Sequence, residues 1–344
     1  MKPSLMFRHG DHVNKRRIDQ ASALAWHAAR RKAILAAHPE VKELYGHAPT
    51  TALWAAGLIV VQVGLTAFAQ HVSWPAVLLL AYVVGPFPAH ALGMLIHEAG
   101  HNLVFRKTWA NKLIAIIANF PLGAPAALEF RVQHALHHRH LGDVDGRDTQ
   151  APTRREAVVV RQSPWVKLAS FTFGRFYFRA RAANHVRFDG WMAFNWALCI
   201  AYGGVVLYFF GAKAFMFGML SGLVGFGPHP LGARRISEHL TARRGQPTNS
   251  YYGVLNRVIF DAGYHVEHHD FPNIPWQRLR KLNRVAREFY DPLYHTRSWT
   301  SLLFSYLFDA RYRVNQYIGM GGDWIEELTP STGLLPNRRS RGGS

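Results

Sequence analysis

The sequence predicts an all-α integral membrane protein, with four transmembrane helices in two hairpins and a helical cap on one side of the bilayer. Two observations lead to this fold class: four long stretches lack charged residues, and the basic residues lie almost entirely outside those stretches. Hydrophobic residues make up 49% and charged residues 18% of the 344-residue chain, which excludes a disordered chain. A single cysteine, Cys199, excludes a disulfide-stabilised secreted scaffold.

The four predicted transmembrane helices are the stretches without Lys, Arg, Asp or Glu. They cover residues 51–70, 74–96, 191–211 and 214–233. At about 1.5 Å per residue, each is long enough to cross a hydrocarbon core of roughly 30 Å. The alternative is a soluble protein with buried core helices, but four such stretches in one soluble chain would be unusual.

The distribution of basic residues predicts the orientation of these helices. The connectors at 71–73 and 212–213 are so short that each helix pair must form a tight hairpin, and together they contain one basic residue, Lys213. The other 39 of the 40 Lys and Arg residues lie outside the hairpins. By the positive-inside rule, both ends of the chain and its middle segment face the cytoplasm. The net charge of +19 therefore suits an anionic leaflet, and we expect no nucleic-acid partner.

We expect three regions along the chain: a cytoplasmic or interfacial N-terminal segment (1–50), a membrane domain (51–310) and a C-terminal tail (311–344). In the first, residues 18–38 are predicted to be helical, with Pro39 ending the helix. Within the second, the uncharged run 113–128 contains Pro121 and Pro125. It is too short to span comfortably, so we expect a re-entrant or surface-lying segment.

Histidine is the residue that predicts chemistry. The chain has 20 histidines, and two copies of the pattern H-x-x-H-H accompany an H-x-x-x-H pair and one isolated histidine. On a helix, positions i, i+3 and i+4 face the same way, so each triple presents a compact set of nitrogen donors. The nine candidate ligands are His97, His101, His134, His137, His138, His239, His265, His268 and His269.

The predicted topology brings these nine histidines to one side of the membrane. Two helices precede the first triple and two more lie between that triple and His239, so all four places emerge on the cytoplasmic face, in the cap. Nine imidazoles exceed the ligand number of one metal ion, whereas two ions with four or five ligands each account for them. Imidazole suits iron, zinc, copper or nickel, so the ligand type alone does not choose the metal.

Three segments resemble the membrane fatty acid desaturase superfamily, most closely the sphingolipid (dihydroceramide) delta-4 desaturases: HEAGHN at 97–102, HALHHRHLG at 134–142 and SYYGVLNRVIFDAGYHVEHHDFPNIP at 250–275. The resemblance extends over residues 25–307. It implies that the nine histidines hold two iron ions. It also implies that the protein uses O₂ and two electrons to make a trans C4–C5 double bond in the long-chain base of dihydroceramide.

The resemblance also implies the partners and the location. The substrate would be a long-chain lipid taken from the bilayer, and electrons would come from a carrier such as cytochrome b5, or ferredoxin with its reductase. No G-x-G-x-x-G nucleotide fingerprint follows a strand in this sequence. The protein would be a multi-pass protein of the bacterial inner membrane, or of the endoplasmic reticulum in a eukaryote, with its active site facing the cytoplasm.

Four residues near the candidate ligands have two possible roles each. His90 matches a family histidine, but we expect a polar residue satisfied within the helix bundle rather than a ligand. Asp145 and Asp148 match an acidic stretch, and each could hydrogen-bond an imidazole or lie in a solvated loop. Glu238 could orient His239 or face water.

Arg234 and Arg235 depart from the family pattern, which typically has His and Phe there. Two cations pointing at a dicationic centre would be repelled, so we expect both at the headgroup surface. The departure leaves the regiochemistry open. C4 hydroxylation and fatty acyl desaturation therefore remain alternatives.

Two other classes of protein remain to be separated. HEAGH also satisfies H-E-x-x-H, the zinc metalloprotease pattern in which Glu98 would be the general base. An intramembrane protease leaves seven of the nine histidines unexplained. A non-catalytic metal-binding or transport protein is the third class, and it predicts that loss of His268 alters metal content without abolishing a lipid conversion.

Overall fold

The structure is a computed structural model of the whole chain. It describes residues 15–143, 145–160, 163–182, 185–240, 242–243, 245–310, 312–314 and 317. Nearly all of the tail expected at 311–344, and the first 14 residues of the expected N-terminal segment, lie outside these ranges. The three-region division of the chain therefore stays a prediction.

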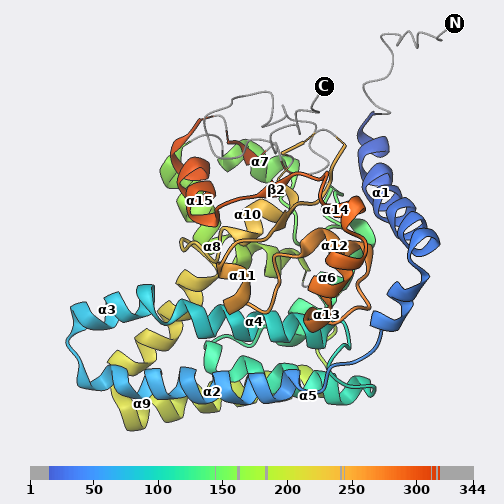
Figure 1. Cartoon of the computed structure of the whole chain (residues 1–344). Helices are drawn as coiled ribbons and strands as arrows, with labels where there is room; N and C mark the ends of the chain where they lie inside the picture. Colours follow the sequence, from blue (N-terminus) through green and yellow to red (C-terminus); the bar gives the residue numbers. More distant parts are fainter. Residues whose placement is uncertain are drawn as a thin grey trace, which may run out of the picture.

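The described helices form two parts (Figure 1). The lower part holds the long apolar helices. These are α2 (Thr51–Phe68) with η2 (Ala69–His71), α3 (Trp74–Val83), α4 (Pro86–Gly100), α5 (Thr108–Asn119) with η3 (Phe120–Leu122), and α9 (Gly190–Gly225).

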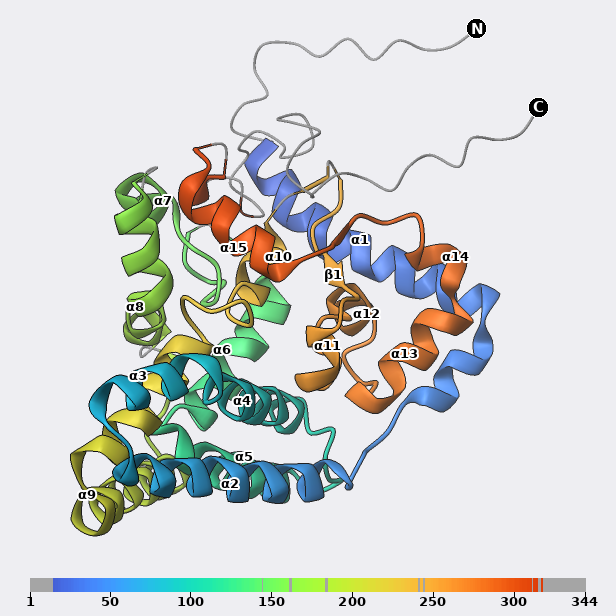
Figure 2. The ribbon, with the colours of Figure 1, turned by 60° about the vertical axis from the view of Figure 1, so that its left-hand side comes forward.

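The upper part consists of shorter elements and covers one side of α4 in both views (Figures 1 and 2). It also holds the only two strands of the described chain, which pair in parallel over two residues each, so the described chain is almost entirely helical, consistent with the all-α prediction. The elements are α1 (Lys15–Ala37), η1 (Pro39–Leu44), α6 (Ala127–His140), α7 (Arg154–Val160), α8 (Pro164–Ala182), α10 (Arg234–His239), β1 (Ser250–Tyr251), α11 (Leu255–Val258), α12 (His265–Asp270), α13 (Trp276–Val285), α14 (Arg287–Tyr290), β2 (His295–Thr296) and α15 (Trp299–Phe308).

The lower part exposes large apolar side chains. Val60 on α2 is 71% exposed, Leu79 on α3 64% and Phe209 on α9 66%. A soluble protein rarely exposes so much contiguous apolar surface, whereas lipid tails solvate it well. By length and composition, two described helices can span a membrane, 51–71 and 190–225, or up to four if each bent helix pair is one span.

The predicted helix 74–96 is broken. Helices α3 and α4 meet at a 44° bend, because Pro86 and Pro88 cannot donate backbone hydrogen bonds to the preceding turn. Gly85 lies at the bend, where a Cβ would overlap the Ser221 hydroxyl of α9, so only glycine allows this close approach. α4 then continues to Gly100, beyond the predicted end.

Helix α9 contains the second predicted hairpin. Gly211 has φ 74° and ψ −175°, a left-handed conformation that glycine adopts without strain. Asn195 donates to the Asn119 side chain at 3.0 Å, while Gly222 lies against the Leu122 carbonyl. Residues 119 and 122 are adjacent in space, so 195 and 222 are near neighbours and the chain must reverse at Gly211.

Both predicted turns lie together at one end of the lower part. The Lys213 ammonium donates to the Val72 carbonyl at 2.7 Å, which ties the 212–213 connector to the 71–73 connector. The predicted helix 214–233 is too long, because α9 ends at Gly225. Gly227, Pro228 and Pro230 follow, and a proline removes a donor that a continuing helix needs.

The uncharged run 113–128 also breaks where its prolines predict. The chain bends by 115° between the 108–122 segment and α6. The Asn119 side chain bridges the break by accepting from the backbone N–H groups of Ala126 and Ala127 at 2.9 and 3.1 Å. This bend packs α6 against α4 and brings its histidines next to those of α10 and α12.

Candidate metal centre

Four separate elements deliver the nine histidines predicted as ligands. α4 carries His97, and His101 follows directly at its C-terminus. α6 carries one triple, α10 ends with His239, and α12 carries the other triple. Each triple occupies one helical face, as the i, i+3, i+4 spacing predicts.

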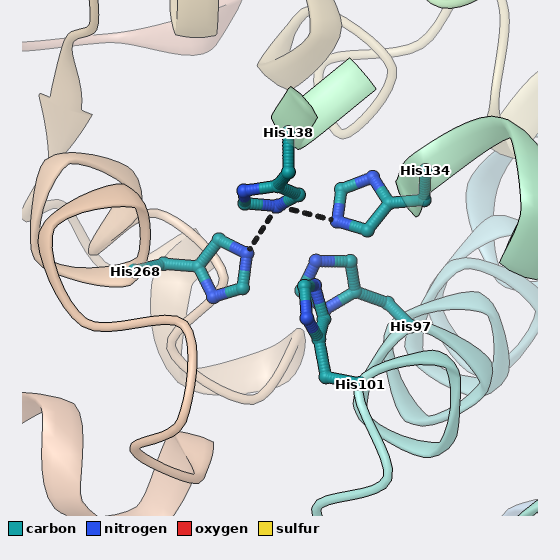
Figure 3. A group of neighbouring side chains, drawn as sticks. All are labelled: His97, His101, His134, His138 and His268. Atoms are coloured by element: carbon teal, nitrogen blue, oxygen red, sulfur yellow. Dashed lines mark hydrogen bonds between the residues drawn. The ribbon is translucent and has the colours of Figure 1, made fainter. Parts of the chain in front are cut away.

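The structure brings all nine histidines together and sorts them into two groups. In each group, one ring nitrogen per histidine lies within 4.8 Å of all the others. Figure 3 shows the first group, whose rings point toward a common centre. The five-nitrogen group is His97, His101, His134, His138 and His268, and the four-nitrogen group is His137, His239, His265 and His269.

The spacing of the ring nitrogens suits a metal ion. His138 Nε2 lies 2.9 Å from His134 Nε2 and 3.1 Å from His268 Nε2 (Figure 3). In the other group, His239 Nε2 lies 3.0 Å from the Nε2 atoms of both His137 and His265. Two nitrogens bound at right angles, each about 2.1 Å from one ion, would lie about 3.0 Å apart.

Two further nitrogens support the same conclusion. His101 Nε2, in the five-nitrogen group, and His269 Nε2, in the four-nitrogen group, are buried without a hydrogen-bond partner. A buried polar atom without a partner costs free energy, which a bound ion would recover. The donor set therefore fits a pair of metal ions, one in each group.

Burial keeps the three imidazoles of α12 neutral. Loss of hydration lowers the pKa of His265, His268 and His269 well below its usual range, and neighbouring imidazoles lower it further. A neutral imidazole keeps a lone pair for a metal, whereas an imidazolium does not. The site is thus ready for metal at neutral pH.

Polar side chains hold several of these rings from behind. Asp148 Oδ1 lies 2.9 Å from His137 Nδ1, so of the two roles considered for this residue the structure shows the hydrogen bond to an imidazole. Asp145 is exposed, and among the described contacts it reaches no imidazole. Gln150 accepts from His134 Nδ1 at 3.0 Å. Such partners fix the tautomer and the direction of the lone pair.

Glu238 contacts a different histidine from the one expected. Its side chain is nearly buried and lies 3.3 Å from Nδ1 of His265, rather than orienting His239 or facing water. It also forms an ion pair with Arg234. Chain adjacency suggested His239, but residues next to each other on a helix point in different directions.

Glu267 is a residue that the sequence analysis missed. It is fully buried between two histidines of α12 and accepts hydrogen bonds from Ser250, Tyr252 and Asn283 at 2.7, 2.8 and 2.6 Å. These bonds fix α12 against β1 and α13. The carboxylate inside the pattern H-V-E-H-H could have signalled this role. α12 has only six residues, so contacts from outside the helix must help to position its three histidines.

The helix predicted at 18–38 is present as α1, but its contact with the histidine site was missed. His27 contacts the carboxylate of Asp270 at 2.7 Å and the Thr248 hydroxyl at 2.8 Å. Arg30 donates to the other Asp270 oxygen at 3.0 Å. The His27 ring lies 5.2 Å from that of His269, so α1 covers the four-nitrogen group.

The expected surface location of Arg234 and Arg235 is wrong. Both line the cavity beside the histidines, and both are only partly exposed, the Arg234 side chain to 13%. The repulsion that motivated the expectation is offset for Arg234 by its ion pair with Glu238. Arg234 Nε also donates to His90 at 3.2 Å.

His90 is a structural residue, as expected. Its Nδ1 donates to the Gly225 carbonyl at 2.8 Å, its Nε2 accepts from Arg234, and its ring stacks on Phe226. Both ring nitrogens are occupied, and His90 belongs to neither histidine group.

The cavity adjoins both groups of histidines. Its volume is about 310 Å³, and its wall includes His97 and His134 from one group and His137, His239 and His265 from the other. Met94, Leu122 and Phe226 extend this wall into the apolar part of the molecule. An alkyl chain entering from the lipid side would therefore reach both groups of nitrogen donors.

Comparison with known proteins identifies the family. The model of the fatty acid desaturase family matches residues 72–301, which include all nine histidines. The chain belongs to the fatty acid desaturase family. A second model, described as sphingolipid Delta4-desaturase, matches residues 26–50, in α1, η1 and the segment that follows them.

Several curated proteins similar to this chain are named sphingolipid delta(4)-desaturases. A rice protein (Oryza sativa subsp. japonica) named "Sphingolipid delta(4)-desaturase DES1-like" is 38% identical, over 82% of this chain and 86% of the relative. The Drosophila melanogaster and human proteins named "Sphingolipid delta(4)-desaturase DES1" are 35% and 34% identical, over 82% of this chain and 89% and 88% of theirs.

Family membership makes this chain an oxidoreductase and sets the zinc protease alternative aside. The structure agrees, because the HEAGH histidines share their group with three histidines from α6 and α12. Glu98 accepts from the backbone N–H of Trp276 at 3.1 Å and so helps to hold the start of α13.

Proposed function

We propose that this protein is a sphingolipid delta-4 desaturase that introduces a trans C4–C5 double bond into the long-chain base of dihydroceramide. The relatives named above support this substrate. The observation that carries the proposal is the shared cavity, because one chamber with a largely apolar wall touches five of the histidines and both nitrogen groups.

The proposed reaction consumes one O₂, two electrons and two protons, removes two hydrogens from adjacent methylene groups and releases two waters. We assign all nine histidines as ligands of two non-haem iron ions, five on one ion and four on the other. When bound, the iron pair supplies the O₂ activation and electron transfer that an unactivated C–H bond requires.

The chain's own residues contribute position and shielding. Neutral imidazoles hold nitrogen lone pairs at fixed points, and Asp148, Gln150 and Glu238 hold those imidazoles. The apolar wall seats a methylene chain and excludes water. Holding the reacting carbons close to the metals would also raise the rate, because the substrate is already oriented before the chemical step begins.

We further propose four membrane spans with the histidine cap facing the cytoplasm, in the bacterial inner membrane or the endoplasmic reticulum. The contact between the two turns, at one end of the lower part, and the basic residues outside them support this orientation. Electrons would arrive from cytochrome b5, or from ferredoxin with its reductase.

Lipid analysis tests this proposal. The protein is expressed in a host that makes dihydroceramide but lacks the activity, and lipids are measured by mass spectrometry. We expect a two-dalton loss in dihydroceramide, with the double bond at C4–C5. A sixteen-dalton gain would favour the hydroxylase alternative, and a change confined to ordinary acyl chains would contradict the sphingolipid assignment.

A matched pair of variants links the product to the metal site. His138 and His140 lie on the same helix, but only His138 belongs to a nitrogen group. We expect His138→Ala to abolish the product and lower the iron content, and His140→Ala to preserve both. Loss of iron without loss of product would support a non-catalytic metal protein instead.

A further inference from the structure

Gln133 is a buried polar residue of the cavity wall. It is 7% exposed and lines the cavity together with Glu129 and His137. These three residues lie four positions apart along α6, so they share one face of the helix, and that face is turned toward the cavity. The Gln133 side chain therefore belongs to the surface that a bound substrate meets.

The other two side-chain amides of this wall already have partners. Asn119 bridges the break before α6 through hydrogen bonds with the backbone, and Gln150 accepts from His134 Nδ1. Gln133 accepts from the Thr149 hydroxyl at 3.0 Å, but through its backbone carbonyl, and among the described residues its side-chain amide makes no hydrogen bond. A buried amide without a partner costs free energy, which a hydrogen-bonding ligand would recover.

Gln133 lies beside both histidine groups. The next residue, His134, belongs to the five-nitrogen group, and His137, one helical turn further on, belongs to the four-nitrogen group. Four residues of helix correspond to about 6 Å along its axis. A substrate atom that hydrogen-bonds to Gln133 must therefore lie only a few bonds from the carbons that reach the metal site.

Dihydroceramide has a polar group at such a distance. Its long-chain base carries hydroxyls on C1 and C3 and an amide on C2, so the C3 hydroxyl is attached to the carbon next to C4. A hydroxyl can donate to the amide oxygen of a glutamine and accept from its N–H. A plain acyl chain has only methylene groups beside the carbons that react, and it would leave the Gln133 amide unpaired.

We infer that Gln133 hydrogen-bonds the C3 hydroxyl of the long-chain base and so selects a hydroxylated base over a plain methylene chain. This inference rests on the proposed function and assigns it a specificity-determining residue. The hydrogen bond fixes the C4–C5 pair beside the histidines, while Met94, Leu122 and Phe226 of the same wall contact the hydrocarbon. A cavity built in this way discriminates against a substrate without the hydroxyl, because its buried amide would stay unpaired.

A binding experiment tests this inference without turnover. The probes are N-hexanoyl dihydrosphingosine and its 3-deoxy analogue. Each competes with tritiated N-hexanoyl dihydrosphingosine for the full-length protein in detergent, without an electron donor. We expect the hydroxylated probe to bind at least about fivefold more tightly, as one net hydrogen bond provides. Equal affinities for the two probes would overturn the inference, and this comparison in the wild-type protein requires no variant to fold.

A matched pair of variants locates the selectivity. Gln133→Met replaces the amide by an apolar side chain of similar length, and it should bring the affinity ratio of the two probes close to one. Gln70→Met makes the same replacement in η2, where the amide donates to the Ala67 carbonyl at 3.1 Å, and it should leave the ratio unchanged. A ratio that survives in Gln133→Met, or that falls equally in Gln70→Met, would contradict the assignment.

The binding result and the lipid analysis separate this inference from the proposed function. Because neither probe must react, selective binding through Gln133 in a protein that yields no C4–C5 double bond would refute the proposed function alone. A C4–C5 product from a protein that binds both probes equally would refute the inference alone.

Discussion

The two histidine groups differ in ligand number and in surroundings. The five-nitrogen group has three partly exposed members, and its described polar support is the amide of Gln150 on His134 and, at the longer distance of 3.7 Å, the carboxyl group of Glu98 beside His97. The four-nitrogen group is fully buried and backed by two carboxylates, Asp148 and Glu238. To hold a metal ion, the five-nitrogen group would thus depend mainly on its number of ligands. The four-nitrogen group would depend mainly on its carboxylate partners and its burial.

This difference implies unequal tolerance to damage. A site with five protein ligands keeps four after one substitution, which is still enough for an ion such as iron or zinc. A site with four protein ligands keeps only three after one substitution. If the lost ligand was held by a carboxylate, that contact no longer orients any ligand. The four-nitrogen group should therefore be the weaker point of the pair.

The largest effect is expected for removal of a ligand from each group. His239→Ala and His268→Ala should both reduce desaturation more than about a hundredfold, because even outer partners of a ligand contribute 10- to 100-fold. We expect His239→Ala to retain about one iron per chain and His268→Ala to retain more. Elemental analysis measures the iron content of each variant. Equal iron losses in the two variants would contradict the predicted difference between the two histidine groups.

The next effect concerns the groups behind the ligands. Asp148→Asn should lower iron affinity about 10- to 100-fold, because the amide no longer strengthens His137 as a donor. Gln150→Ala should have a smaller effect, since a neutral amide on His134 polarises the ring less. Competition with a chelator reports both affinities. A larger loss in Gln150→Ala would reverse the comparison.

A smaller effect is expected from loosening α1. His27→Ala removes two buried hydrogen bonds and should lower the free energy of unfolding by about 1–3 kcal/mol. Because α1 covers His269 rather than the five-nitrogen group, iron should leave the four-nitrogen group faster. Hydrogen exchange of α1 together with the rate of iron release measures this. Equal acceleration at both groups would contradict it.

The smallest effect is a pH dependence at the far end of α1. The hydrogen bond to Glu288 raises the pKa of His38, and the same bond lowers the pKa of Glu288. The His38 contribution is present below the unfolded pKa of 6.5 and is lost as pH rises through the raised value. The Glu288 contribution is present above 4.5 and is lost on acidification.

Protection of α1 from hydrogen exchange should therefore be greatest between pH 4.5 and pH 6.5, the unfolded pKa values of Glu288 and His38. At alkaline pH the protection should decline by only roughly twofold, because an exposed ion pair contributes little to stability. His38→Ala should remove this pH dependence without changing iron content. A change in iron content would mean that the surface end of α1 also supports the metal site.

The sequence predicted which histidines come together better than it predicted what surrounds them. The nine histidines were found because helical spacing and topology are local properties of the chain. Their division into five and four was not predictable, because His137 and His138 are neighbours in sequence yet belong to different groups. Which neighbour faces which group depends on how α4, α10 and α12 pack against α6.

Charged residues at the site were the least predictable. Arg234 and Arg235 were expected at the surface because isolated charges avoid a metal centre. The structure places Glu238 where it neutralises Arg234, and a pairing of this kind depends on tertiary packing. Likewise, Pro86, Pro88 and Gly211 were visible in the sequence, but the 44° bend and the chain reversal became clear only from the packing of α9 against α3 and α4.

Mössbauer spectroscopy of the protein enriched in ⁵⁷Fe tests the central claim most directly, because it counts iron environments without requiring turnover. Five nitrogen ligands on one ion and four on the other predict two distinct iron signals of equal intensity, at two irons per chain. His239→Ala should selectively diminish one of them. A single iron environment, or one metal ion per chain, would contradict the account.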